Sequence, residues 1–251
     1  MSSIPVALQL YSLRDAAKKD FLQTVRDAAA AGYEGVEFAG FFGQPAAAVR
    51  KTAADAGLAV AGAHVGFDLL QPDQFNATVD YHAELGNTRL VIPGLPKNAY
   101  DTPDARRRTL DFLGELTAKL KARGMRTGYH SHAFDFQPLP EGGTLYNAIG
   151  DGTPADFILQ IDVGNTVQAG ADPVVYLERY PGRAEQVHLK EARLGKWNLP
   201  IGAGDVPWNA IFRSCLALGA TRWYIVEVEE YWGEPLECAR QDRAILRQLG
   251  V

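Results

Sequence analysis

Two histidines, His130 and His132, stand one residue apart in the segment GYHSHAFDF, and the whole chain has five histidines. Residues two apart on a β-strand point to the same face, so both imidazoles would reach one site. Segments of the same kind carry Asp162, His188 and Glu227. A mixed carboxylate and imidazole set suits manganese, iron, cobalt or zinc better than calcium, which prefers oxygen ligands. The pattern indicates a site for one divalent ion.

The chemistry that such a site supports is proton transfer next to a polarised oxygen. A divalent ion with open positions acts as a Lewis acid on a hydroxyl or carbonyl group, and a nearby base can then remove a proton from the adjacent carbon. The candidates for proton transfer are Glu227, Lys190, His64 and Glu37. The candidates for binding and orienting the substrate are Gln9, Tyr11, Gln160 and Glu229.

The elements that must position these side chains follow a repeated pattern. Alanine- and leucine-rich helical segments end at a glycine, and a β-rich run begins two or three residues later, because glycine just past a helix end supplies the left-handed backbone that terminates it. The glycines are Gly32, Gly57, Gly86, Gly124 and Gly219. The predicted strands are 5–12, 34–40, 59–66, 88–94, 126–134, 157–164, 185–191 and 223–229.

Strands that alternate with helices imply parallel pairing. Eight such units in 251 residues match an α/β protein with a single-domain (β/α)8 TIM barrel over residues 1–251. An open doubly wound sheet is the rival, but it would carry a glycine-rich phosphate loop where this chain reads LYSLRDAAKKD. Near the ends of the last four strands, polar residues occupy every second position, so they share one face of the strand, as barrel-facing residues would.

Bulk composition excludes several classes of protein. The net charge is −5 and no lysine or arginine run stands out, so we expect no nucleic-acid partner. The basic cluster at residues 106–108 is expected to be a solvated helix face. The amino-terminal MSSIPVALQLYS predicts neither a signal peptide nor a membrane anchor, and hence a cytoplasmic protein. Cys215 and Cys238 are expected to be buried free thiols.

The segments ALQLYSLRD, GYEGVEFAG, GYHSHAFDF, ILQIDVGN, VHLKEA and WYIVEVEEY together resemble the sugar phosphate isomerase/epimerase family, within the xylose isomerase-like TIM barrels. The resemblance implies one divalent metal ion, Mn2+ before Mg2+, Co2+, Zn2+ or Fe2+, with Asp162, His188 and Glu227 as ligands. Epimerases of this type have a strand-five glutamate as fourth ligand and acid/base. This chain has HSH there, which leaves His130, His132 or water as the fourth ligand.

These observations predict a metal-dependent enzyme that isomerises or epimerises a sugar or keto-sugar derivative through an enediolate. Because the strand-five glutamate is missing, a lyase or dehydratase acting on a 3-keto sugar or glycoside is the alternative. A non-catalytic sugar-binding subunit is a further alternative. An endonuclease IV-like nuclease would need a richer histidine cluster and a basic groove. The expected partner is a small sugar, and the oligomeric state, including a homo-oligomer, stays open.

Overall fold

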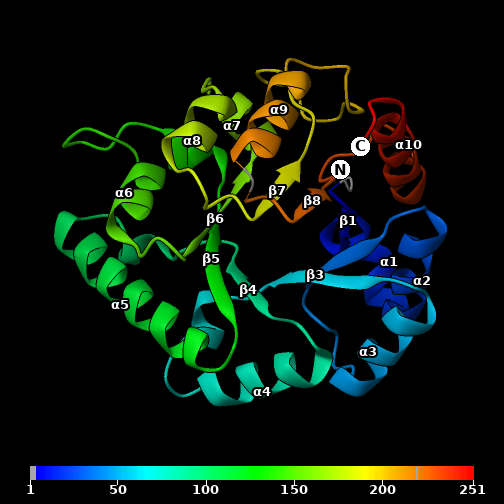
Figure 1. The fold of residues 1–251 in the computed structure, drawn as a ribbon, viewed down its shortest axis with the longest axis horizontal. Coiled ribbons are helices and arrows are strands. Elements are labelled where there is room, and N and C mark those ends of the chain that lie inside the picture. The colour runs from blue at the N-terminus through cyan, green and yellow to red at the C-terminus, as the bar shows by residue number, and fades with distance from the viewer. Residues whose placement is uncertain (1–3, 219) are drawn as a thin grey trace.

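A computed structural model describes residues 4–218 and 220–251. Eight parallel strands close into a barrel in chain order, and β1 pairs with β8 to complete the ring (Figure 1). The strands are β1 (Val6–Gln9), β2 (Gly35–Ala39), β3 (Ala59–His64), β4 (Arg89–Ile92), β5 (Arg126–His130), β6 (Ile158–Asp162), β7 (Gln186–Leu189) and β8 (Trp223–Val226). The predicted (β/α)8 barrel and all eight strands are confirmed.

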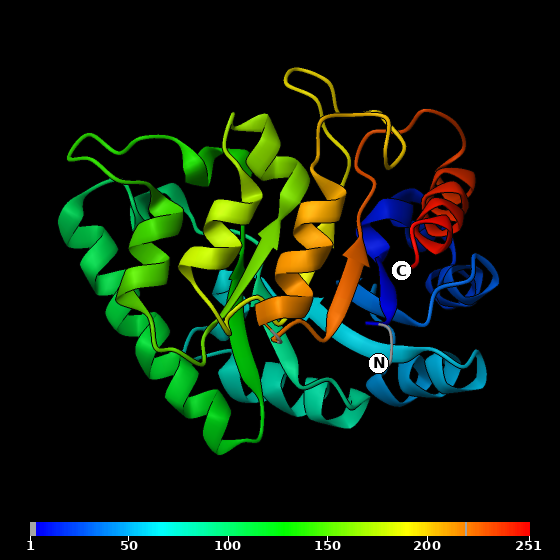
Figure 2. The same cartoon turned by 45° about the horizontal axis from the view of Figure 1, so that its top comes forward.

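Helices surround the barrel and cover its outer face (Figures 1 and 2). The α-helices are α1 (Arg14–Lys19), α2 (Phe21–Ala30), α3 (Ala46–Asp55), α4 (Phe75–Leu85), α5 (Pro103–Ala122), α6 (Leu145–Gly152), α7 (Val163–Gln168), α8 (Pro173–Arg179), α9 (Trp208–Leu218) and α10 (Pro235–Gln248). Short 3-10 turns follow four strands: η1 (Leu10–Leu13), η2 (Phe67–Leu70), η3 (Lys97–Ala99) and η4 (Ala133–Phe136).

Glycines end the helices as the repeat predicts. Gly32, Gly57, Gly86 and Gly124 all have φ between +70° and +91°, in the left-handed region. Gly219 lies outside the described residues. The strands themselves are shorter than predicted, so Tyr11 and His132 fall in the turns after β1 and β5.

The core has an outer and an inner part. Most buried apolar side chains pack between the strands and the helix layer, where each large one contributes about 1.5–3 kcal/mol on burial. Inside the barrel, a small apolar cluster of Ala7, Ala61 and Ile225 with Trp223 fills the amino-terminal end. The polar residues of the same parity therefore stack above this cluster, toward the carboxyl ends of the strands.

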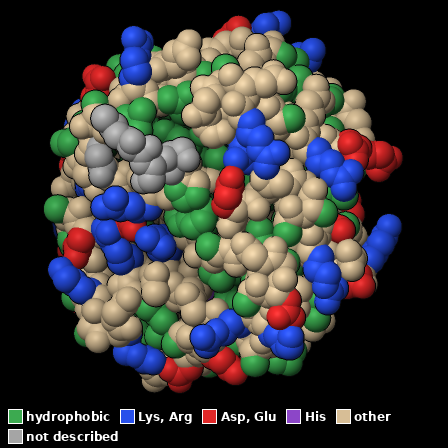
Figure 3. Space-filling view, turned by 45° about the vertical axis from the view of Figure 1, so that its right-hand side comes forward, with side chains coloured by type: hydrophobic (Ala, Val, Ile, Leu, Met, Phe, Trp, Pro, Cys, Tyr) green, Lys and Arg blue, Asp and Glu red, His purple; other side chains and the backbone are tan. Residues whose placement is uncertain are grey.

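The surface carries mixed charge. On the face in Figure 3, basic and acidic side chains are interspersed without a continuous patch of one sign. Arg107 and Arg108 are exposed as expected, but Arg106 is buried, where it pairs with Glu141 and donates to the Tyr100 carbonyl at 2.6 Å. Cys215 and Cys238 are buried free thiols. Among the described residues, we find no helix with the length and apolar character to traverse a bilayer.

Candidate active site

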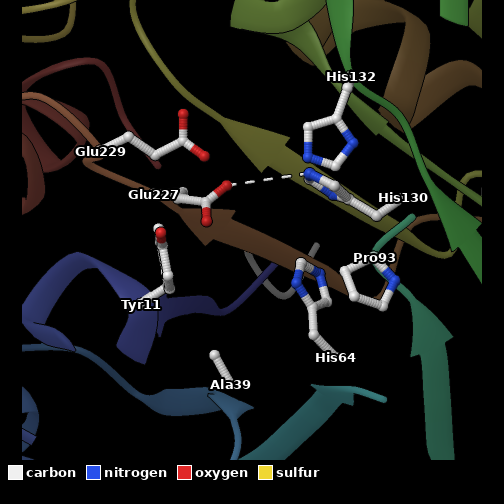
Figure 4. Close-up of a pocket in the computed structure, with 8 residues that line it drawn as sticks. All are labelled: Tyr11, Ala39, His64, Pro93, His130, His132, Glu227 and Glu229. Carbon is white, nitrogen blue, oxygen red and sulfur yellow. Dashed lines mark ion pairs between the residues drawn. The ribbon is translucent and has the colours of Figure 1, made fainter. Parts of the chain in front are cut away.

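A cavity of about 360 Å3 opens at the end of the barrel where the strands finish (Figure 4). Its size is in the range of small-molecule sites, and barrel enzymes place their sites at this end. The lining residues come from the ends of β2, β3 and β5 and from the segments that follow β1, β4, β5 and β8. They are Tyr11, Ala39, His64, Pro93, His130, His132, Glu227 and Glu229.

Four buried side chains converge beneath this opening. His130, Asp162, His188 and Glu227 each offer one nitrogen or oxygen atom, and these atoms lie within 4.8 Å of one another. His64 forms a second such group with His130 and His188. Two imidazoles and two carboxylates form the donor set that manganese, iron, cobalt or zinc accept. The residues present therefore fit a divalent metal ion.

Local structure aims one oxygen of Asp162 at this centre. Asp162 ends β6 and caps α7, since its Oδ1 accepts a hydrogen bond from the Asn165 amide at 2.8 Å. The Asp162 amide in turn donates to the Ser131 hydroxyl at 3.0 Å. Its Oδ2 is buried and lies 2.9 Å from the Lys190 ammonium. A buried carboxylate requires a cation nearby, and Lys190 supplies one here.

Glu37 fixes the orientation of His188. Glu37 of β2 points into the barrel, where Glu37 Oε2 accepts a hydrogen bond from His188 Nε2 at 2.7 Å. His188 Nδ1 then faces Glu227 Oε2 at 3.2 Å. Burial alone would lower the pKa of His188, but the Glu37 carboxylate and the bond to Glu227 raise it to about 10. A carboxylate behind a ligating histidine fixes its ring and tautomer.

Lys190 supplies the positive charge among these carboxylates. Its ammonium lies 2.9 Å from Asp162 Oδ2, 3.3 Å from Glu227 Oε2 and 3.2 Å from Glu229 Oε2. Burial opposes ionisation of Glu227, but the charges of Lys190 and His188 hold its pKa well below the usual value. Burial raises the pKa of Glu229, and Lys190 offsets part of this rise. Lys190 therefore offsets part of the free-energy cost of burying these carboxylates.

The two walls of the cavity differ in chemistry. Glu227, Glu229 and Tyr11 lie on one side in Figure 4, and the three imidazoles lie on the other. Burial lowers the pKa of His132 and lowers that of His130 well below its usual value. His132 Nδ1 is buried without a hydrogen-bond partner in the described parts of the chain. The cavity thus offers carboxylates on one wall and imidazoles on the other.

The sequence matches the model of the xylose isomerase-like TIM barrel family over residues 25–249. The chain belongs to the xylose isomerase-like TIM barrel family. A curated relative, an inosose dehydratase from Geobacillus thermodenitrificans, is 23% identical over 269 aligned positions, which cover 91% of this chain and 89% of the relative.

Two solved structures superpose over nearly the whole chain. A sugar phosphate isomerase/epimerase from Parabacteroides distasonis has a TM-score of 0.85 at 22% identity and covers 98% of this chain and 97% of its own. A probable 3-DHS dehydratase involved in petrobactin synthesis from Bacillus anthracis has a TM-score of 0.72 at 15% identity, with 97% and 98% covered. At these identities the likeness establishes the fold.

In this xylose isomerase-like barrel, some predicted site residues lie beneath the cavity instead of lining it. Gln9 and Gln160, expected to bind substrate, are fully buried and donate to Glu37, each at 2.7 Å. Glu37, expected to transfer protons, also accepts from Gln186 at 3.1 Å and pairs with His64 at 3.2 Å. With both oxygens occupied, Glu37 is placed to position His188 and not to contact a substrate. The expected roles of Gln9, Gln160 and Glu37 at the substrate stay predictions, and their side chains lie beneath the cavity.

The other predicted residues lie at or beside the cavity. Tyr11, His64 and Glu229 line it, and Lys190 lies beside Glu229. Of the strand-five pair, His130 belongs to the four-residue metal group and His132 belongs to neither candidate group. His132 instead lines the cavity, at the start of η4.

Several supporting residues escaped the sequence prediction. Asp135 holds the His132 backbone, because its Oδ2 accepts from the His132 amide at 2.7 Å and its Oδ1 from the Tyr129 hydroxyl at 2.9 Å. Gly62 leaves room for the network under the cavity, since a Cβ there would lie 2.5 Å from Gln186 Nε2. The Asp-x-x-Asn spacing of Asp162 and Asn165 was an available signal for a helix cap.

Two buried carboxylates hold the long connection between β7 and α9, which rises at the rim of the barrel beside α9 (Figure 2). Glu191 accepts hydrogen bonds from the Gly202 amide at 2.6 Å and the Trp208 indole at 2.8 Å. Asp242 of α10 accepts from the Ile201 amide at 2.8 Å. Burial raises the pKa of Asp242 to about 7, and the nearby Glu191 contributes to this rise.

Asp242 makes stability depend on pH in a defined direction. Its folded pKa of about 7 exceeds the ordinary 3.8, so the folded protein holds this proton more tightly than the unfolded chain. The free energy of unfolding should therefore fall by a few kcal/mol (order of magnitude) as pH rises between those two values. Asp242→Asn should remove this decline, as measured by urea unfolding at about pH 4.5 and pH 7.5. Equal declines in both proteins would contradict the assignment.

Proposed function

We propose that this protein is a metal-dependent lyase of the dehydratase type, which eliminates a leaving group from a keto sugar or keto cyclitol. The curated relative at 23% identity is an inosose dehydratase, which supports elimination from a polyhydroxylated ketone. The proposed substrate is a small neutral sugar, and we propose no nucleic-acid partner. A divalent ion, Mn2+ first, held by His130, Asp162, His188 and Glu227 would polarise the substrate carbonyl and stabilise charge on its oxygen.

The observation that carries this proposal is the difference between the two walls. Elimination needs one group to take a proton from the carbon next to the carbonyl and another to protonate the departing oxygen. Glu229 is the carboxylate on the acidic wall that is outside the four-residue metal group. His132 is the imidazole on the opposite wall that is outside both candidate groups. One free acid/base group on each wall suits a reaction that moves two protons at neighbouring atoms.

We assign the acceptor role to Glu229 and the donor role to His132. The Lys190 ammonium at 3.2 Å favours the ionised form of Glu229 and holds it in place. Asp135 fixes the backbone of His132 and so its approach to the substrate. Tyr11, on the acidic wall, is placed to orient the sugar. Lys190 is thus a positioning residue in this mechanism.

Isomerisation or epimerisation is the second candidate function. It is supported by the Parabacteroides distasonis isomerase/epimerase, which superposes over 98% of this chain. In epimerisation, the acid/base groups on the two walls would remove a proton from one face of a carbon and return a proton to the opposite face. The absence of a leaving-group step distinguishes the two reactions, because an epimerase conserves the composition of its substrate.

The test is to assay the protein with a keto inositol in D2O, after chelation and again after loading with Mn2+. Elimination yields an unsaturated ketone, seen by its ultraviolet absorbance and by loss of water in the mass spectrum. We expect this product with Mn2+ and none after chelation. Deuterium incorporation with unchanged composition would favour epimerisation. No conversion and no exchange on any keto polyol tried would count against both enzyme functions and favour a binding protein.

A further inference from the structure

Glu229, the proposed proton acceptor, lies on a segment without regular secondary structure. β8 ends at Val226 and α10 begins at Pro235, so residues 228–231 belong to neither element. In the part of the chain that the structure describes, no backbone–backbone hydrogen bond joins residues 228–231 to another segment. A reacting group must be held in a defined position, because a displacement of about 1 Å can lower a rate about 100-fold. The side chains that hold this segment therefore bear on the reaction.

Two side chains connect this segment to the turn after β1, the strand that pairs with β8. The Ser12 hydroxyl is fully buried and accepts a hydrogen bond from the Val228 amide at 2.9 Å. The Tyr231 hydroxyl donates to the Ser12 carbonyl at 3.0 Å. Ser12 and Tyr231 thus hold the two ends of residues 228–231 against η1, and Glu229 lies between these ends.

Arg14 makes the connection at Glu229 itself. Its Nη2 donates to the Glu229 carbonyl at 2.9 Å, and its Nη1 donates to the Tyr231 hydroxyl at 2.6 Å. Its guanidinium carbon lies 4.8 Å from the centre of the Tyr11 ring and 5.1 Å from that of the Tyr231 ring, within cation–π range. Tyr11 and Glu229 line the same wall of the cavity (Figure 4). Arg14 therefore contacts two residues of that wall from behind.

The contact of Arg14 with Glu229 differs in kind from that of Lys190. The Lys190 ammonium lies 3.2 Å from the carboxylate of Glu229, whereas Arg14 binds the backbone carbonyl of the same residue. Glu229 is thus held at both its side chain and its backbone. A planar fork that donates to two acceptors while it stacks on aromatic rings is a task in which lysine does not replace arginine.

We propose that Arg14 is a positioning residue, which fixes Glu229 and Tyr11 on the cavity wall by connecting the turn after β1 to the segment after β8. This inference rests on the proposed acid/base role of Glu229. Arg14 is not among the described residues that line the cavity, so it acts through Tyr11 and Glu229. Loss of its side chain should free the Glu229 backbone and leave the four-residue metal group in place.

The experiment measures exchange of the C–H bond next to the carbonyl of a keto inositol in D2O, with Mn2+-loaded protein. Arg14→Ala should lower the exchange rate by about 10–100-fold without changing Mn2+ affinity. Added methylguanidinium should restore part of this rate, because Arg14 is only half-buried and the cation can donate the same hydrogen bonds. Arg14→Lys should remain well below the wild type.

The matched control is Arg126→Ala. Arg126 is also half-buried and donates to a backbone carbonyl at 2.9 Å, that of Asp156, but it begins β5 at the opposite end of the barrel. This variant should exchange substrate C–H as the wild type does and should not respond to methylguanidinium. Tyr231→Phe removes one acceptor of Arg14 and keeps the ring, so it should show a smaller loss than Arg14→Ala. It keeps the proposal testable if Arg14→Ala does not fold.

A second measurement needs neither metal nor turnover. Hydrogen–deuterium exchange of backbone amides, followed by mass spectrometry in the metal-free proteins, should be several-fold faster over residues 227–234 in Arg14→Ala than in the wild type. The same peptide should be unchanged in Arg126→Ala. Peptides from β5 and α6 should exchange equally in Arg14→Ala and the wild type.

The outcomes separate this proposal from the function on which it rests. Equal amide exchange over residues 227–234 in Arg14→Ala and the wild type would overturn the connection, whether or not the protein is a lyase. Faster amide exchange with an unchanged C–H exchange rate would overturn the positioning role and leave the lyase function standing. Equal losses of C–H exchange in Arg14→Ala and Arg126→Ala, without rescue, would also overturn it. If the wild type neither eliminates nor exchanges, the acid/base function fails, and the positioning role fails with it even if amide exchange upholds the connection.

Discussion

Replacing Glu229 by glutamine should lower kcat by about 10²–10⁴-fold, the range in which positioned acid/base groups contribute. The amide has nearly the shape of the carboxylate but cannot accept the proton from the substrate carbon. Because Glu229 is outside the four-residue metal group, Mn2+ affinity should change little. The reaction is followed by the absorbance of the unsaturated ketone, and Mn2+ affinity by calorimetry.

Isotope exchange distinguishes Glu229 from its partner across the cavity. In D2O, Glu229→Gln should lose both elimination and exchange of the substrate C–H, because the first proton transfer is blocked. His132→Gln should lose elimination yet keep exchange, because it lacks only the donor to the departing oxygen. Glu230→Gln, an exposed glutamate one residue further along, is the control and should behave as the wild type. Exchange that survives in Glu229→Gln and disappears in His132→Gln would reverse the two roles.

The fold was predictable from the sequence because its signals are local. A glycine that ends a helix in the left-handed conformation, as Gly86 does at φ +83°, is visible in the sequence, and so is the apolar run that follows. Regular repetition of this unit leaves few topologies, and a closed barrel is the one that eight units favour. The metal group also followed from local pattern, since strand alternation gives each residue its side of the sheet.

The alternation of side chains along a strand could not predict how deep each side chain lies along the barrel axis. Gln9, Glu37 and Gln160 have the parity of the site, but they lie one level beneath it, in a network around Glu37. This network depends on contacts between distant strands, such as the hydrogen bond from Gln160 of β6 to Glu37 of β2, which no local pattern encodes. Parity likewise failed to separate His130 from His132, because β5 ends at His130 and the turn of η4 places His132 at the cavity.

Asp162→Asn should weaken Mn2+ binding by more than about 100-fold without unfolding the protein. Removing a residue that only supports a metal ligand already lowers metal affinity by about 10–100-fold, and removing a ligand itself should lower it further. The asparagine Oδ1 can still accept from the Asn165 amide and cap α7, so the helix start is preserved. What is lost is the negative charge on Oδ2, the oxygen that lies 2.9 Å from the Lys190 ammonium. The measurements are Mn2+ content after gel filtration, calorimetric affinity and the Mn2+-induced rise in Tm.

Glu37→Gln tests the layer behind the ligands in the same assays. The amide removes the charge that orients His188, so Mn2+ affinity should fall by about 10–100-fold, less than in Asp162→Asn. The order of affinities should thus be wild type, Glu37→Gln and Asp162→Asn, with Glu230→Gln equal to the wild type. Equal affinity in all four proteins would rule out Asp162 as a ligand. If Mn2+ affinity falls only in Glu37→Gln, the ligands would instead be His64, His130 and His188. Glu37 contacts this three-histidine group through His64 and His188.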